Sequence, residues 1–157
     1  MIKFTSYALT FAEVPDEISL CINISNCPRR CPNCHSPLLQ EDVGEDLAQK
    51  LPALLDKFGG DITCVCFMGE GNDLAALAAC IEYAASRGFH TCLYTGSEHP
   101  RDFPLEHLNY IKIGPYIEAL GGLDHRTTNQ RMYRVLHGGA VPALVDITHR
   151  FWPQDNI

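Results

Sequence analysis

Three cysteines, Cys27, Cys31 and Cys34, lie within one short segment of the chain, separated by three and then by two residues. Cysteine thiolates are the usual ligands of iron–sulfur clusters. Three thiolates on one loop can hold three irons of a four-iron cluster and leave the fourth iron without a protein ligand. An iron with an open position can bind a reactant, so the spacing predicts a [4Fe-4S] site built for chemistry.

Two other metal sites are compatible with parts of this segment. A structural zinc site needs four ligands, and His35 is adjacent to Cys34 and poorly placed to share its metal. Cys64 or Cys66 can complete a zinc set, although strands usually bury such residues. Cys31, Cys34 and His35 also match the haem attachment pattern Cys-x-x-Cys-His, but that attachment normally requires export. Zinc and haem therefore remain alternatives to the favoured iron–sulfur cluster.

The elements that must position this loop alternate between strands and helices. Apolar, β-branched runs predict strands, and apolar residues at helical spacing with capping residues predict helices. Strands are expected at 18–24, 62–68, 91–94, 110–113 and 143–148, and helices at 47–58, from 72 or 73 to 88, and near 104–108. Pro52 is expected to kink the first helix or to mark a late start.

This alternation predicts an α/β fold with right-handed βαβ units and a mostly parallel sheet. Because eight such units take about 250 residues, a chain of 157 residues is expected to form a partial, open (β/α) barrel. We expect one domain over residues 1–157, with a less regular C-terminal segment from about Gly114. In such folds ligands gather at the C-terminal ends of the strands, where Cys27, Gly69-Glu70 and Thr95-Gly96 are expected to lie.

Composition narrows the class of protein. Twelve Lys and Arg against nineteen Asp and Glu give a net charge of -7, without the basic runs that track nucleic-acid phosphates. No stretch approaches the roughly 18 apolar residues of a membrane span, and the N-terminus makes a poor signal peptide. We therefore expect a cytoplasmic protein, with no nucleic-acid or membrane partner. Its thiols should be reduced, and the five cysteines outside the loop are expected to pack in the core.

Several segments together resemble one family of radical S-adenosylmethionine enzymes. The chain resembles the anaerobic ribonucleoside-triphosphate reductase activating proteins over about residues 18–135. The matching segments are Asn26-Cys-Pro-Arg-Arg-Cys-Pro-Asn-Cys-His35, Met68-Gly69-Glu70, Leu93-Tyr94-Thr95-Gly96, Gly114-Pro-Tyr-Ile117 and Asn129-Gln130-Arg131. Met68 stands where the family has a glycine, Asn33 stands where it often has one, and residues 14–17 replace its usual Asp-Gly-Pro-Gly.

The resemblance implies a specific activity. Cys27, Cys31 and Cys34 would bind a [4Fe-4S] cluster, and S-adenosylmethionine would bind the fourth iron through its amino and carboxylate groups. Reductive cleavage would yield a 5'-deoxyadenosyl radical, which takes a hydrogen atom from a glycine of the partner, an anaerobic (class III) ribonucleoside-triphosphate reductase. A protein such as flavodoxin or ferredoxin would supply the electron. No catalytic side chain is assigned, since abstraction by a carbon radical needs no general base.

The same resemblance implies contacts to the cofactor. The backbone of Gly69 and Glu70 would lie near the methionine amino group, and that of Asn33 and His35, which flank Cys34, near the adenine. Gly69 alternatively serves only as the turn into the following helix. Asn129-Gln130-Arg131 either binds a partner or stabilises a loop.

Two further functions stay open. The first keeps the cofactors and changes the target to another glycyl-radical enzyme or to a small molecule. The second is a non-catalytic zinc-binding module that mediates protein contacts.

Overall fold

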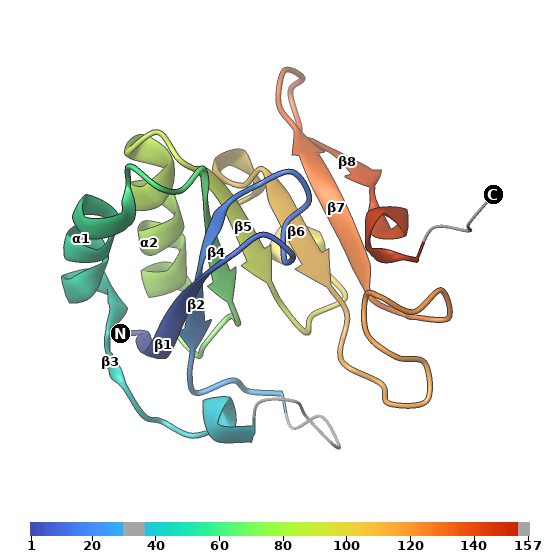
Figure 1. The fold of residues 1–157 in the computed structure, drawn as a ribbon, viewed down its shortest axis with the longest axis horizontal. Coiled ribbons are helices and arrows are strands. Elements are labelled where there is room, and N and C mark those ends of the chain that lie inside the picture. Colours follow the sequence, from blue (N-terminus) through green and yellow to red (C-terminus); the bar gives the residue numbers. More distant parts are fainter. Residues whose placement is uncertain (30–36, 154–157) are drawn as a thin grey trace.

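The computed structural model describes residues 1–29 and 37–153, and this part of the chain forms an α/β fold around one open, eight-stranded mixed sheet. Figure 1 shows the strands side by side, with α1 and α2 packed together next to them. The spatial order is β3-β1-β2-β4-β5-β6-β7-β8. The strands are β1 (Lys3–Thr10), β2 (Ser19–Ile24), β3 (Glu45–Asp46), β4 (Cys64–Met68), β5 (His90–Tyr94), β6 (Tyr110–Ile113), β7 (Arg131–Leu136) and β8 (Ala143–Asp146).

The centre of the sheet is parallel and its flanks are antiparallel. Strands β2, β4, β5 and β6 pair in parallel, whereas β3 with β1, β1 with β2, β6 with β7 and β7 with β8 pair antiparallel. The prediction of a mostly parallel sheet was therefore wrong, because hairpin-type connections add antiparallel neighbours without a crossover helix. The sheet is open, as expected, but its barrel-like character is not confirmed.

Both main helices begin where a side chain caps them. Helix α1 (Leu47–Phe58) starts after Asp46, whose carboxylate accepts a hydrogen bond from the Ala48 N–H at 3.0 Å. Helix α2 (Leu74–Ser86) starts after Asp73 in the same way. Pro52 lies inside α1, so the alternative of a late start was wrong.

Shorter elements complete the fold. The helix expected near residues 104–108 is a single 3-10 turn at Leu105–His107. Three further 3-10 helices lie in the described residues, at Pro37–Gln40, Pro100–Asp102 and Thr148–Phe151. None of the helices in the described residues is both long enough and apolar enough to cross a membrane.

The two faces of the sheet bury different residues. On the helix side, apolar side chains such as Leu20, Ile22 and Phe67 form the larger core with α1 and α2. On the opposite side, Cys21, Cys66 and other residues form a second, smaller cluster. Successive residues of a strand point to opposite faces, so each central strand contributes to both. The second face, which α1 and α2 do not cover, carries the candidate site.

Candidate functional site

The end of β2 delivers Cys27 to the edge of the sheet where the parallel strands finish. The Cys27 N–H donates to the Leu39 carbonyl at 2.8 Å, and the Asn26 N–H donates to the Glu41 carbonyl at 2.9 Å. These bonds tie the chain just after β2 to the segment that returns to β3. Cys27 is half-buried there. Its position agrees with the expected edge of the sheet.

Four more residues with a predicted role in cluster or cofactor binding lie outside the described residues. They are Cys31, Asn33, Cys34 and His35.

Gly69 directly follows β4, the strand next to β2, and its backbone conformation favours glycine. Its φ is +118°, and a Cβ there would lie 3.2 Å from the Ile24 carbonyl oxygen of β2. The Gly69 N–H donates to the Tyr94 carbonyl at 2.9 Å. The missing side chain therefore leaves β2 and β4 in close backbone contact. Gly69 also lies in the turn between β4 and α2, so a role in this turn and a contact to a ligand are compatible.

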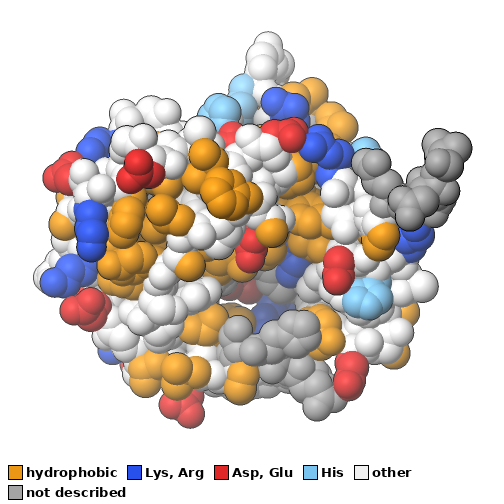
Figure 2. Space-filling model, in the orientation of Figure 1, with side chains coloured by type: hydrophobic (Ala, Val, Ile, Leu, Met, Phe, Trp, Pro, Cys, Tyr) orange, Lys and Arg blue, Asp and Glu red, His pale blue; other side chains and the backbone are white. Residues whose placement is uncertain are grey.

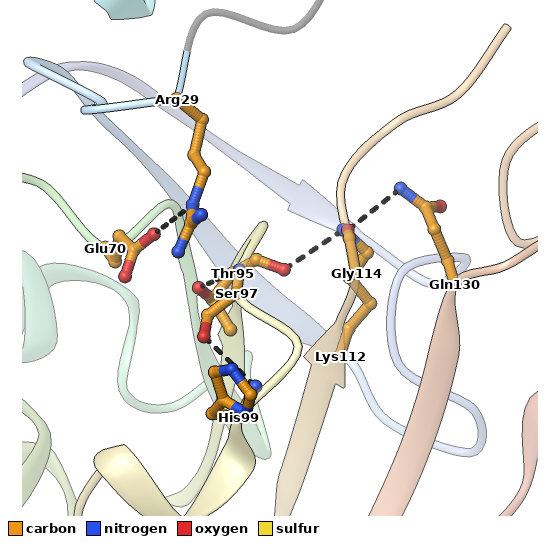
Figure 3. Close-up of polar contacts among 8 residues, drawn as sticks. All are labelled: Arg29, Glu70, Thr95, Ser97, His99, Lys112, Gly114 and Gln130. Carbon is orange, nitrogen blue, oxygen red and sulfur yellow. Dashed lines mark hydrogen bonds and ion pairs between the residues drawn. The ribbon is translucent and has the colours of Figure 1, made fainter.

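Glu70 is a buried carboxylate beside the Cys27 loop. Its side chain is 8% exposed, and its Oε1 accepts a charge-assisted hydrogen bond from Arg29 Nε at 3.3 Å. Figure 3 shows Arg29 reaching from the loop after β2 toward Glu70. The structure therefore brings the chain next to Cys27 and the Gly69-Glu70 turn together at one edge. The pairing of Arg29 with Glu70 was not predicted from the sequence.

The end of β5 is held by short-range hydrogen bonds. The Ser97 N–H donates to Thr95 Oγ1 at 3.0 Å, and the His99 N–H donates to Ser97 Oγ at 3.1 Å. Thr95 and Ser97 are both buried. Gly96 lies between them, against the side chain of Arg29. The expected Thr95-Gly96 segment is thus part of the same edge.

Lys112 is the buried cation of the site, and the sequence reasoning missed it. Its Nζ donates to the carbonyls of Thr95 at 3.3 Å and Gly114 at 3.0 Å, so it connects the ends of β5 and β6 (Figure 3). The Gln130 amide donates to the same Gly114 carbonyl at 3.4 Å. A lysine within the apolar run of residues 110–113 was the available signal, because Lys is almost never fully buried unless paired.

A cavity of about 620 Å³ lies beside these residues. This volume is within the range of small-molecule sites. The space-filling view is hollowed near its centre (Figure 2). The lining residues are Ala12, Glu13, Met68, Tyr94, Lys112, Tyr116, Gly122, Leu123, Asp124, Gln130 and Phe151.

In the Asn129-Gln130-Arg131 segment, one residue lines the cavity and the other two contact neighbouring parts of the chain. Asn129 donates to the Pro115 carbonyl at 3.0 Å, and Arg131 pairs with Asp146 at 3.6 Å. Gln130 lines the cavity. Within the described residues the buried Asn129 Oδ1 accepts no hydrogen bond. Loop stabilisation is therefore part of the role of this segment, and Gln130 also faces the candidate site.

Five cysteines outside the loop are buried, as expected for core packing. They are Cys21, Cys64, Cys66, Cys80 and Cys92. Cys21, Cys66 and Cys92 are directly opposite one another on β2, β4 and β5. Across residues 1–29 and 37–153, however, no group of three or more Cys, His, Asp or Glu is arranged to hold a metal ion.

We predict that these five thiols alkylate far more slowly than the three in the loop. Burial raises the pKa of the Cys64, Cys66 and Cys92 thiols, and it raises the pKa of Cys80 to about 11. The pKa of Cys21 is also raised, first by its hydrogen bond with Cys66. Since the thiolate is the nucleophile, both effects slow the reaction. Mass spectrometry after iodoacetamide treatment of the native, metal-free protein measures the rates, and fast labelling of the buried five would contradict the fold.

The loop between β1 and β2 reaches the cavity, and contacts between charged side chains hold it in position. Glu13 lines the cavity, and its carbonyl accepts a hydrogen bond from the Tyr94 hydroxyl. Glu17 contacts His90 Nδ1 at 2.5 Å, and Arg150 donates two hydrogen bonds to Asp16, at 3.0 and 2.8 Å. These contacts hold the loop over the face opposite the helices.

The Asp16–Arg150 pair predicts a pH-dependent contribution to stability. The hydrogen bond from Arg150 lowers the pKa of Asp16 below its ordinary value. A carboxyl group with a lowered pKa in the folded state stabilises the protein above its unfolded pKa, and this stabilisation is lost as pH falls through the folded pKa. Urea unfolding should therefore show Asp16→Asn to be less stable than the wild type at pH 7, with a smaller difference at pH 3. A difference that is unchanged at pH 3 would contradict this assignment.

Comparison with protein-family models, with curated proteins and with solved structures found no match for this chain. The functional argument therefore depends on the residues and their positions. A thiol loop at the end of β2 and a glycine turn at the end of β4 lie on adjacent parallel strands. The three cysteines fit an iron–sulfur cluster by residue type, because thiolates are the usual ligands of such a cluster.

Proposed function

We propose that this protein is a cytoplasmic radical S-adenosylmethionine oxidoreductase that activates a glycyl-radical enzyme. One observation carries the proposal. Cys27, the first of the three cysteines, follows β2 at the edge where the adjacent parallel strand β4 leads into the Gly69-Glu70 turn. The resemblance of its motifs to the activating proteins of anaerobic ribonucleoside-triphosphate reductase names the target. The four parallel strands would correspond to the core of a partial barrel.

In this proposal the chain supplies ligands and position. Cys27, Cys31 and Cys34 would hold the [4Fe-4S] cluster, and the backbone of Gly69 and Glu70 would bind the methionine part of S-adenosylmethionine. The backbone beside Cys34, at Asn33 and His35, would lie near the adenine. A cluster held by these residues would, when reduced, supply the electron for cleavage of S-adenosylmethionine to methionine and a 5'-deoxyadenosyl radical, which would take a hydrogen atom from the partner's glycine.

The remaining residues of the site would orient the reactants. The buried Lys112 ammonium links the ends of β5 and β6 through hydrogen bonds to two carbonyls beside the cavity. Met68 and Tyr94, the last residues of their strands, line the same cavity. No residue is required to move a proton.

Glycyl-radical formation tests this function. The reconstituted protein would be mixed without oxygen with S-adenosylmethionine, reduced flavodoxin or ferredoxin, and a class III ribonucleoside-triphosphate reductase. We expect a glycyl-radical signal by electron paramagnetic resonance, together with 5'-deoxyadenosine. A Cys31→Ala protein serves as the control and should give neither. Deoxyadenosine without a glycyl signal would retain the cofactors and reject this reductase as the target.

A further inference from the structure

Arg29 lies in the loop after β2, but its side chain contacts a buried carboxylate at the end of the neighbouring strand. It lies two residues after Cys27 and is 43% exposed, yet its Nε donates to the nearly buried Glu70. Within the described residues, Arg29 is the one hydrogen-bond partner of the Glu70 carboxylate. A buried carboxylate needs such a partner, because burial without one is costly. The contact with Arg29 therefore offsets the cost of burying the Glu70 carboxylate.

Gly96 provides the space for the Arg29 stem. A Cβ at Gly96 would lie 3.2 Å from Arg29 Cγ and 3.3 Å from Arg29 Cδ. The stem thus lies directly against the backbone that follows β5, and a side chain at position 96 would require the stem to shift by a few tenths of an ångström. Figure 3 shows the side chain directed toward both Glu70 and the Thr95–Ser97 segment. Two strand ends contact one arginine.

We propose that Arg29 is a positioning residue that fastens the start of the cysteine loop to the ends of β4 and β5. This inference rests on the proposed function only in assuming that the loop binds a cluster. Backbone bonds from Asn26 and Cys27 hold one side of the loop start. Arg29 holds the other side, so Cys27 is fixed between two anchors before any metal binds. Preorganised ligands lose less conformational freedom on binding a cluster.

Four variants separate this role from a merely structural ion pair. Arg29→Ala removes the anchor, and Arg29→Lys keeps the charge on a flexible stem. Gly96→Ala displaces the arginine stem while leaving every charge in place, and its backbone φ is not in the left-handed region. Gly60→Ala is the matched control, because a Cβ there meets no atom within 4 Å.

The first readout is the alkylation rate of Cys27 in the metal-free protein, resolved by mass spectrometry. We expect Arg29→Ala and Gly96→Ala to raise it by roughly threefold to tenfold, the range for a partly exposed charge-assisted contact. Arg29→Lys should restore part of the protection, and Gly60→Ala should match the wild type. Buried Cys80 in the same molecule should stay slow, because it reports global unfolding.

The second readout is iron per chain after anaerobic reconstitution at limiting iron, which should fall in Arg29→Ala and Gly96→Ala. Wild-type alkylation rates and iron contents in both variants would overturn the proposal. Equal acceleration of Cys27 and Cys80 would also overturn it, since it would show a general loss of stability. Absence of iron in the wild type would reject the proposed function, while the alkylation comparison would still decide the role of Arg29.

Discussion

Replacing Cys31 with alanine is expected to remove the cluster and leave the protein folded. The wild type should bind about four irons per chain, whereas two remaining thiolates should hold close to none. Cleavage of S-adenosylmethionine should disappear with the iron. The fold should survive, because the described residues already form an extensive core under α1 and α2 and a second cluster on the other face of the sheet. Iron analysis, absorption spectra and thermal unfolding of the same preparation measure these effects.

Cys80→Ala is the control for a general effect of losing a thiol. Cys80 is buried in α2, so its removal should lower the free energy of unfolding by about 1 kcal/mol without changing the iron content. A Cys31→Ala protein that unfolds on removal of the thiol would instead indicate a structural metal site. A variant that keeps its iron and its activity would exclude Cys31 as a ligand.

Replacing Gly69 with alanine is expected to have the second-largest effect, on both stability and cofactor binding. The φ of +118° is one that side chains rarely adopt, and the new Cβ would approach the Ile24 carbonyl oxygen to 3.2 Å. Such backbone strain costs about 1–3 kcal/mol. Relief requires the ends of β2 and β4 to separate, which moves the Cys27 loop away from Glu70. Urea unfolding should show the stability loss, and calorimetry of the reconstituted protein should show weaker S-adenosylmethionine binding.

Gly60→Ala again gives the matched comparison, with open space around the added methyl group. It should change neither unfolding nor cofactor binding by a measurable amount. If Gly69→Ala were as stable as Gly60→Ala, the turn would not be strained as described. If it were destabilised but bound S-adenosylmethionine as well as the wild type, Gly69 would be a turn residue alone.

The centre of the fold was predictable because its signals are local. Strands β2, β4, β5 and β6 are apolar and β-branched, and Asp73 caps α2 as expected. Strand β1 was missed because polar residues interrupt it and much of it is exposed near the edge of the sheet. Strand β7 was missed because only Met132 and Val135 are buried and two arginines interrupt its apolar residues. Without these strands the antiparallel flanks could not be anticipated, and the sheet was expected to be mostly parallel.

The residues at the end of each strand could be predicted from the sequence, but the contacts between residues of different strands could not. Cys27 and Gly69-Glu70 end adjacent strands, so their common edge followed from the expected topology. The Arg29–Glu70 pair joins residues 41 positions apart, and no local pattern specifies such a contact. Lys112 is similar, because its partners are carbonyl groups, which sequence patterns do not distinguish. The cavity depends on where two long loops fold back, and their backbones carry no periodic signal.

The measurement that bears most directly on the central claim is the metal content of the protein prepared without oxygen, combined with its reaction with S-adenosylmethionine. The proposed function predicts a brown protein with about four irons and matching sulfide per chain. After reduction it should release 5'-deoxyadenosine and methionine. A protein that binds stoichiometric zinc, takes up no iron under the same conditions and leaves S-adenosylmethionine intact would contradict it.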